Sequence, residues 1–98
     1  MTKKRTRSAK PILLGARLTI VQAAGLHSLL LARFAGGGDI VIDGTRVEEI
    51  DTAILQLLAS LWRTTAERGI ACAWAGVSAG LRRTANLVGM TDMLHLPR

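Results

Sequence analysis

The feature that most constrains the fold is a short apolar run, Asp39-Ile40-Val41-Ile42-Asp43, in which three β-branched residues stand between two acids. A run without polar alternation is typical of a strand that is buried on both faces of a parallel sheet. Parallel strands cannot be joined by a tight hairpin, so a longer crossover, usually a helix, has to connect this strand to the next one. The run therefore predicts an α/β fold.

The segment that follows this strand supplies the crossover helix. Four of its apolar residues recur at positions i, i+3, i+4 and i+7, which places them on one face of a helix. These residues are Ile54, Leu57, Leu58 and Leu61. We expect the helix to begin at Asp51-Thr52, whose side chains suit an N-cap, and to run to about Arg68, with Gly69 as its C-cap.

The rest of the chain continues the alternation of strands and helices. Extended segments are predicted at residues 12–14, 16–20 and 70–75, with a loop at residues 44–50. Helices are predicted at residues 21–34 and 78–89, with one short terminal helix at 90–96. In residues 70–75 bulky side chains alternate with alanines, so we expect a small face that lets a helix approach closely. The expected architecture is a mixed, mainly parallel sheet of about four strands covered by helices.

The positive charge of the chain is concentrated at its N-terminus. Five of the basic residues lie in the first ten positions, and removing them from the formal net charge of +6 leaves +1. We interpret residues 1–10 as a disordered basic tail and residues 11–98 as one domain. Contact of the tail with nucleic acid or an anionic surface is the alternative, but the domain lacks a basic face and stacking aromatics.

No catalytic or metal-binding constellation is visible. His27 and His95 have no His, Cys or acid at metal-ligand spacing, and Cys72 is the single cysteine. The glycines at 36–38 follow a helix and precede a strand, the reverse of a phosphate-binding loop. We therefore predict neither enzyme activity, nor a cofactor, nor a metal site. The lone cysteine, and the lack of an apolar run of roughly 20 residues, favour a cytoplasmic protein without a membrane span.

One segment carries a candidate site, because a carboxylate and a hydroxyl stand where a loop leads into the crossover helix. Asp51 and Thr52 can be read simply as helix caps, or as part of an exposed surface that binds a partner and can be switched. The loops after neighbouring parallel strands meet at one edge of a sheet, so Thr45, Arg46 and Ser78 could share that surface. Capping alone would also account for Ser78, solvation for Arg82 and Arg83, and packing for Trp62.

Three segments, in this order and at this spacing, resemble those of a known family. They are Leu14-Gly15-Ala16-Arg17-Leu18-Thr19-Ile20 with Ala23-Ala24, Ile50-Asp51-Thr52-Ala53 with Leu55-Gln56-Leu57-Leu58, and Gly76-Val77-Ser78 leading into Leu81. The family is the STAS domain, the fold of the anti-sigma-factor antagonists, and the resemblance covers about residues 12–96. The chain looks similar to bacterial stand-alone domains with Asp-Thr-Ala in this loop.

The resemblance implies a non-enzymatic, bacterial signal-transduction protein that works by protein–protein interaction. The implied partner is an anti-sigma factor or switch kinase, another signalling protein such as those of chemotaxis, or the ATPase of a lipid-transport ABC system. The residues we expect to contact the partner are Thr45, Arg46, Glu49, Asp51, Thr52, Ala53, Ile54, Gln56 and Ser78.

The resemblance also bears on regulation. In the sporulation-type antagonists the loop reads Asp-Ser-Ser-Gly, and phosphorylation of the second serine abolishes binding. Ala53 stands at that position here and cannot be phosphorylated, which leaves Thr52 as the candidate hydroxyl. Ile54 replaces the family's glycine and is either a surface contact or part of the core. The expected behaviour is constitutive binding.

Overall fold

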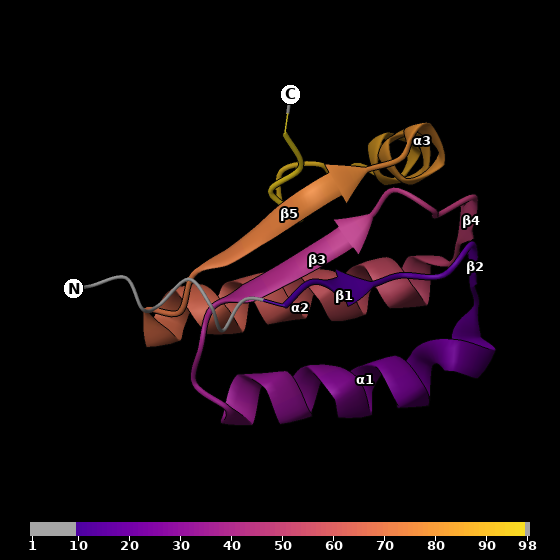
Figure 1. Ribbon diagram of the computed structural model, residues 1–98. Coiled ribbons are helices and arrows are strands. Elements are labelled where there is room, and N and C mark those ends of the chain that lie inside the picture. Colours follow the sequence, from indigo (N-terminus) through magenta and orange to yellow (C-terminus); the bar gives the residue numbers. More distant parts are fainter. Residues whose placement is uncertain (1–9, 98) are drawn as a thin grey trace.

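The computed structural model describes residues 10–97. The elements, in chain order, are β1 (Ile12–Leu13), β2 (Arg17–Leu18), α1 (Ile20–Ala35), β3 (Ile40–Gly44), β4 (Glu49–Ile50), α2 (Thr52–Arg68), β5 (Cys72–Val77) and α3 (Ala79–Leu87) (Figure 1). The predicted basic tail lies outside the described residues except for Lys10, whose carbonyl accepts a hydrogen bond from the Arg33 guanidinium at 2.5 Å.

The strands form two parallel ladders. A three-stranded sheet has the order β1-β3-β5, and β2 pairs with β4 in a separate two-stranded ladder. Ile42 lies between Ile12 of β1 and Trp74 of β5 in the register. The predicted α/β fold with a mainly parallel sheet is confirmed. The predicted loop at residues 44–50 is wrong at both ends, because Gly44 belongs to β3, and Glu49 and Ile50 pair with Arg17 and Leu18.

The helix ends follow from their capping residues. Thr19 begins α1 with a capping box, in which its hydroxyl accepts from the Val21 N–H and the Gln22 side chain accepts from the Thr19 N–H. Gly69 ends α2 in the left-handed conformation, with φ 71°. Residues 91–95 form turns and not the predicted terminal helix, although the Leu94 N–H still reaches the Met90 carbonyl at 3.0 Å.

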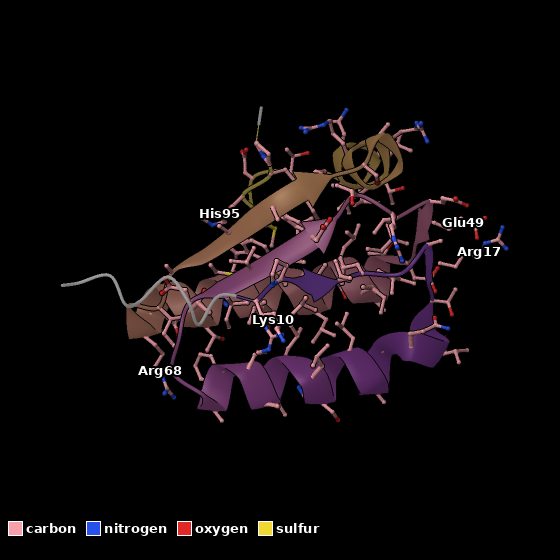
Figure 2. All side chains as sticks on the ribbon, viewed as in Figure 1. Lys10, Arg17, Glu49, Arg68 and His95 are labelled. Carbon is pink, nitrogen blue, oxygen red and sulfur yellow. The ribbon has the colours of Figure 1, made fainter. Side chains whose placement is uncertain are left out.

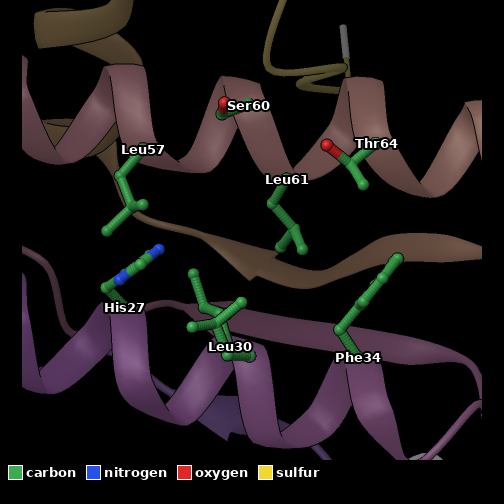
Figure 3. A pocket seen from close by; sticks show the side chains of 8 residues that line it. His27, Leu30, Phe34, Leu57, Ser60, Leu61 and Thr64 are labelled. Carbon is green, nitrogen blue, oxygen red and sulfur yellow. The ribbon is translucent and has the colours of Figure 1, made fainter.

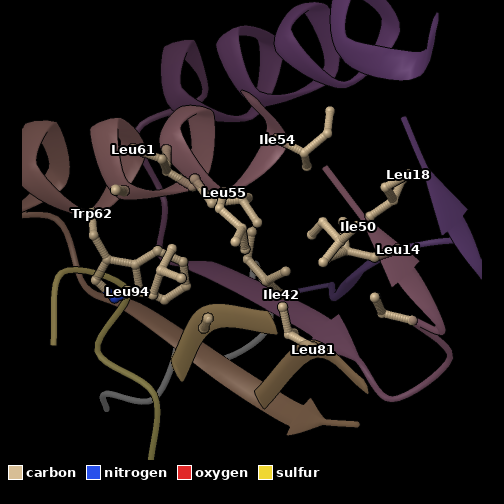
Figure 4. Packing of buried hydrophobic residues seen from close by; sticks show 14 of the residues in the cluster. Leu14, Leu18, Ile42, Ile50, Ile54, Leu55, Leu61, Trp62, Leu81 and Leu94 are labelled. Carbon is tan, nitrogen blue, oxygen red and sulfur yellow. The ribbon is translucent and has the colours of Figure 1, made fainter. Parts of the chain in front are cut away.

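The core lies on one face of the three-stranded sheet, against α1 and α2 (Figure 4). Ile40 and Ile42 of β3 point into it and are at most 1% exposed, and Leu55 and Leu58 of α2 meet them with no exposed surface. Trp62 is buried and stacks on Trp74 with ring centroids 4.9 Å apart, which confirms packing as its role. Burial of these side chains is the main stabilising term for a domain of this size.

No helix of residues 10–97 covers the opposite face of the sheet, which corrects the prediction of a strand buried on both faces. Val41 and Asp43 of β3 are only half-buried, and the alanines at 71, 73 and 75 are exposed. In Figure 1 α2 runs behind the sheet, and no helix of the described chain lies over the alanine face. The alternation in β5 thus separates core from solvent, as in a half-buried strand.

Candidate functional site

The loop that precedes α2 is fixed by backbone hydrogen bonds to a segment more than thirty residues earlier. The Glu48 and Glu49 N–H groups both donate to the Ala16 carbonyl, at 2.8 and 3.0 Å, and the Asp51 N–H donates to the Leu18 carbonyl at 2.9 Å. These bonds place the start of α2 beside the start of α1, at the edge where the parallel strands end (Figure 1). The sequence-predicted loop is therefore a rigid part of the fold.

Asp51 occupies the N-cap position of α2, but its side chain does not cap that helix. Its Oδ2 accepts a hydrogen bond from the Ile20 N–H, the first residue of α1, at 3.0 Å. A carboxylate at this place also interacts favourably with the positive end of the α1 dipole. The capping interpretation is corrected accordingly, since Asp51 joins the two helix starts to each other.

Three predicted contact residues lie exposed on the first turns of α2. Thr52 and Ala53 open the helix and Gln56 follows one turn later, and all three are exposed. Within residues 10–97 the Thr52 hydroxyl makes no hydrogen bond. Ile54 is different, because its side chain is 0% exposed and belongs to the core. The prediction that Ile54 contacts a partner is therefore wrong, as its place in the apolar stripe already indicated.

Two exposed apolar residues at the start of α1 were not predicted to take part. Ile20 is 63% exposed and Val21 is 79% exposed, and the Ile20 backbone is bonded to Asp51. The sequence indicates their exposure, because neither residue lies on the helix face of Leu26 and Leu30, the buried positions of α1. We call Ile20, Val21, Asp51, Thr52, Ala53 and Gln56 the helix-start surface.

Thr45 and Arg46 lie after the end of β3 and are exposed. The Thr45 hydroxyl and N–H both donate to Asp43 Oδ1, at 2.7 and 2.9 Å. These hydrogen bonds, that of the hydroxyl first, lower the pKa of the Asp43 carboxyl below its usual value. The Thr45 hydroxyl is thereby committed to its own turn, and no interaction links Thr45 or Arg46 to Thr52 within residues 10–97.

Ser78 faces inward and caps α3. Its Oγ accepts from the Leu81 N–H at 3.0 Å and donates to the Val47 carbonyl at 2.6 Å. The capping interpretation accounts for both bonds, so Ser78 holds α3 against the loop before β4 and offers no free hydroxyl. Gly80 follows at a point where a Cβ would lie 2.9 Å from the Glu48 carbonyl oxygen, so only glycine fits without a shift.

Glu49 is the remaining predicted contact residue. Its carboxylate lies 3.6 Å from Arg17 Nε, with the two side chains 67% and 69% exposed (Figure 2). An ion pair this exposed contributes on the order of 0–1 kcal/mol at most. It leaves both side chains free to exchange partners at the rim of the helix-start surface.

Cys72 is the first residue of β5. Burial raises the pKa of the Cys72 thiol to about 11, a direction opposite to that of a reactive cysteine. A groove of about 160 Å³ between α1 and α2 is walled mainly by leucines and Phe34, with His27, Ser60 and Thr64 as its polar side chains (Figure 3). Among residues 10–97, no helix combines the length and apolarity that a membrane crossing requires.

Comparison with known protein families places the chain. A family model described as "Mlab, STAS domain" matches residues 1–96, nearly the whole sequence. A comparison with curated proteins gives no significant match. STAS domains are generally non-enzymatic regulatory or binding domains, and they typically mediate protein–protein interaction. With its parallel sheet, three helices and matching family model, the chain belongs to the STAS domain family.

Proposed function

We propose that this protein is a non-enzymatic, cytoplasmic adaptor that binds a protein partner through the helix-start surface. The observation that carries the proposal is the presence of exposed Ile20 and Val21 beside exposed Thr52 and Ala53, on two helix starts joined by Asp51. Apolar side chains at the centre of a surface, with polar groups around them, are the usual composition of a protein interface. Preorganised backbone lowers the entropic cost of binding.

The proposal includes the state of the switch. Ala53 cannot carry a phosphate, so the surface stays competent to bind at all times unless Thr52 is modified. A phosphate on Thr52 would place about −1.5 to −2 charges beside Asp51, and its burial under a partner would be costly. Phosphorylation at Thr52 would therefore weaken binding without unfolding the domain.

Two classes of partner fit a permanently competent surface. The first is a regulatory protein of the anti-sigma-factor, switch-kinase or chemotaxis-signalling kind. The second is the ATPase of a lipid-transport ABC system. Ala53 supports this second class, because a permanent subunit needs no phosphorylation switch. Whichever class applies, the same helix-start surface is expected at the interface.

The test compares two alanines that are both exposed on α2, at its opposite ends. The partner is first captured from the source cells, identified by mass spectrometry and purified. The Kd of the complex between this partner and the wild type, Ala53→Arg or Ala66→Arg is then measured by calorimetry. We expect Ala53→Arg to weaken binding by more than about tenfold, a loss of the size seen at interface hot spots, and Ala66→Arg to leave the Kd unchanged.

The contrary result is equally clear. Equal affinities for Ala53→Arg and Ala66→Arg, with both variants folded by circular dichroism, would place the interface elsewhere on the domain. Thr52→Glu, which imitates the charge of a phosphate, is expected to weaken binding in the same assay. If Ala53→Arg loses affinity and Thr52→Glu does not, the regulatory role of Thr52 is refuted and the proposed interface still stands.

A further inference from the structure

A hollow lies between α3 and the C-terminal segment, and it shares no residue with the helix-start surface. It has a volume of about 470 Å³, and the walls are Ala79, Arg82, Arg83, Asn86, Thr91 and Pro97. Figure 1 shows α3 and the C-terminal segment at the same end of the molecule, beyond β5. Asn86 lies one turn after Arg82 and Arg83 on α3, at i+4 and i+3, and all three side chains line the hollow.

The side chains in this hollow supply hydrogen-bond donors and positive charge. One guanidinium N–H of Arg82 donates to the Pro97 carbonyl, which holds this side chain at the wall and leaves its other N–H groups available. Arg83 is exposed, and it makes no ion pair with another residue in the 10–97 range. Among residues 10–97 no carboxylate lines this hollow, although Asp92 lines a smaller hollow that shares Asn86 and Thr91.

Thr91 adds an independent observation. Its Oγ1 is buried and, within the described part of the chain, has no hydrogen-bond partner. Buried polar groups normally have a partner, so an unsatisfied hydroxyl in the wall of a hollow calls for an explanation. Thr91 lines the hollow, and a change of its rotamer is needed to present this hydroxyl to an oxygen bound there.

We propose that the hollow binds a phosphate group, held by the guanidinium groups of Arg82 and Arg83. Planar guanidinium groups pair with phosphate oxygens through two parallel N–H···O bonds, and their charge persists at every physiological pH. The Asn86 amide and the Thr91 hydroxyl supply neutral donors to the remaining oxygens. This site is separate from the protein interface proposed above, and neither proposal depends on the other.

The test is a titration of the full chain, ¹⁵N-labelled, with inorganic phosphate, followed by NMR at constant ionic strength. We expect saturating shifts confined to the amides of residues 79–86 and 91–96. Arg83→Gln should raise the Kd for phosphate by about tenfold, the loss expected for a charged hydrogen bond. Arg63→Gln removes the same charge from an exposed position on α2 and should leave the Kd unchanged.

Several results would overturn the proposal. These are shifts that do not saturate, shifts that chloride reproduces, or an equal change in Arg83→Gln and Arg63→Gln. If Arg83→Gln loses the dispersed spectrum of a folded protein, Asn86→Ala replaces it, with an expected rise in Kd of about threefold for one neutral hydrogen bond. A parallel titration with O-phospho-L-serine identifies the source of the phosphate. Tighter binding than that of inorganic phosphate assigns the site to a phosphorylated chain, and equal binding assigns it to the free ion.

Discussion

Two glycines in helices are expected to respond to alanine in opposite ways. Gly25 lies inside α1, where an added Cβ would meet nothing within 4 Å. Gly80 lies in the first turn of α3, where the same Cβ would be 2.9 Å from the Glu48 carbonyl oxygen and 3.1 Å from that of Val47. Neither oxygen can move freely, because the Val47 carbonyl accepts from Ser78 and the Glu48 N–H is bonded to Ala16.

The magnitudes follow from these contacts. Gly25→Ala gains helix propensity without a clash, so it should stabilise the protein by about 0.5–1 kcal/mol. Gly80→Ala gains less than that in the first turn and forces α3 away from the loop, a kind of overpacking that costs about 1–3 kcal/mol. We expect a net destabilisation of roughly 1–2 kcal/mol. For a domain of this size, about 1 kcal/mol moves the Tm by roughly 4–8 °C.

The assay is urea and thermal unfolding followed by circular dichroism for the wild type and both variants. A higher Tm for Gly25→Ala and a lower Tm for Gly80→Ala would support the close contact between α3 and the loop before β4. A Gly80→Ala protein as stable as the wild type would refute it, and with it the placement of Ser78 against Val47. The Gly25→Ala result guards against a general effect of alanine at glycine positions.

Two further predictions concern single side chains. Asp51→Ala should destabilise the domain by about 1–2 kcal/mol in urea unfolding, because the Ile20 N–H loses its acceptor. Asp51→Asn keeps an acceptor oxygen and should cost about half as much. Equal stability of all three proteins would contradict the hydrogen bond between the two helix starts. Cys72 should react slowly with iodoacetamide at pH 8 in the folded protein, and faster only as the pH approaches about 11, because its thiol keeps its proton up to that range. If the folded protein at pH 8 reacts as fast as the protein unfolded in urea, the thiol is not shielded.

Most of the fold could be predicted from periodicity because its long elements have strong local signals. Residues close together in the sequence specify the apolar stripe of α2, its Gly69 cap and the β-branched run of β3. β4 could not be found in this way, because it is two residues long and exists only through its pairing with β2. The open alanine face of β5 also depends on how many helices remain to cover it, which no local pattern reports.

The candidate site was predicted in part for the same reason. Thr52, Ala53 and Gln56 are exposed because of their positions around the turn of α2, and helical periodicity alone places them away from the stripe. The partner of Asp51 is 31 residues away in the sequence, so a local capping rule could not identify it. Ile20 was missed because residues 16–20 were predicted to be extended, whereas α1 begins at Ile20 and presents Ile20 and Val21 on its exposed first turn.

The diversion of Asp51 toward α1 has a consequence for any protein that covers this surface. The Asp51 carbonyl accepts from the Ile54 and Leu55 N–H groups, but within residues 10–97 the N–H groups of Thr52 and Ala53 have no acceptor. Solvent hydrates these two donors in the isolated domain. A partner that excludes water from these two N–H groups must supply a hydrogen-bond acceptor, or the binding free energy is weakened by about 1–3 kcal/mol for each donor left unpaired. Selectivity between partners can therefore rest on hydration, with shape and charge held the same.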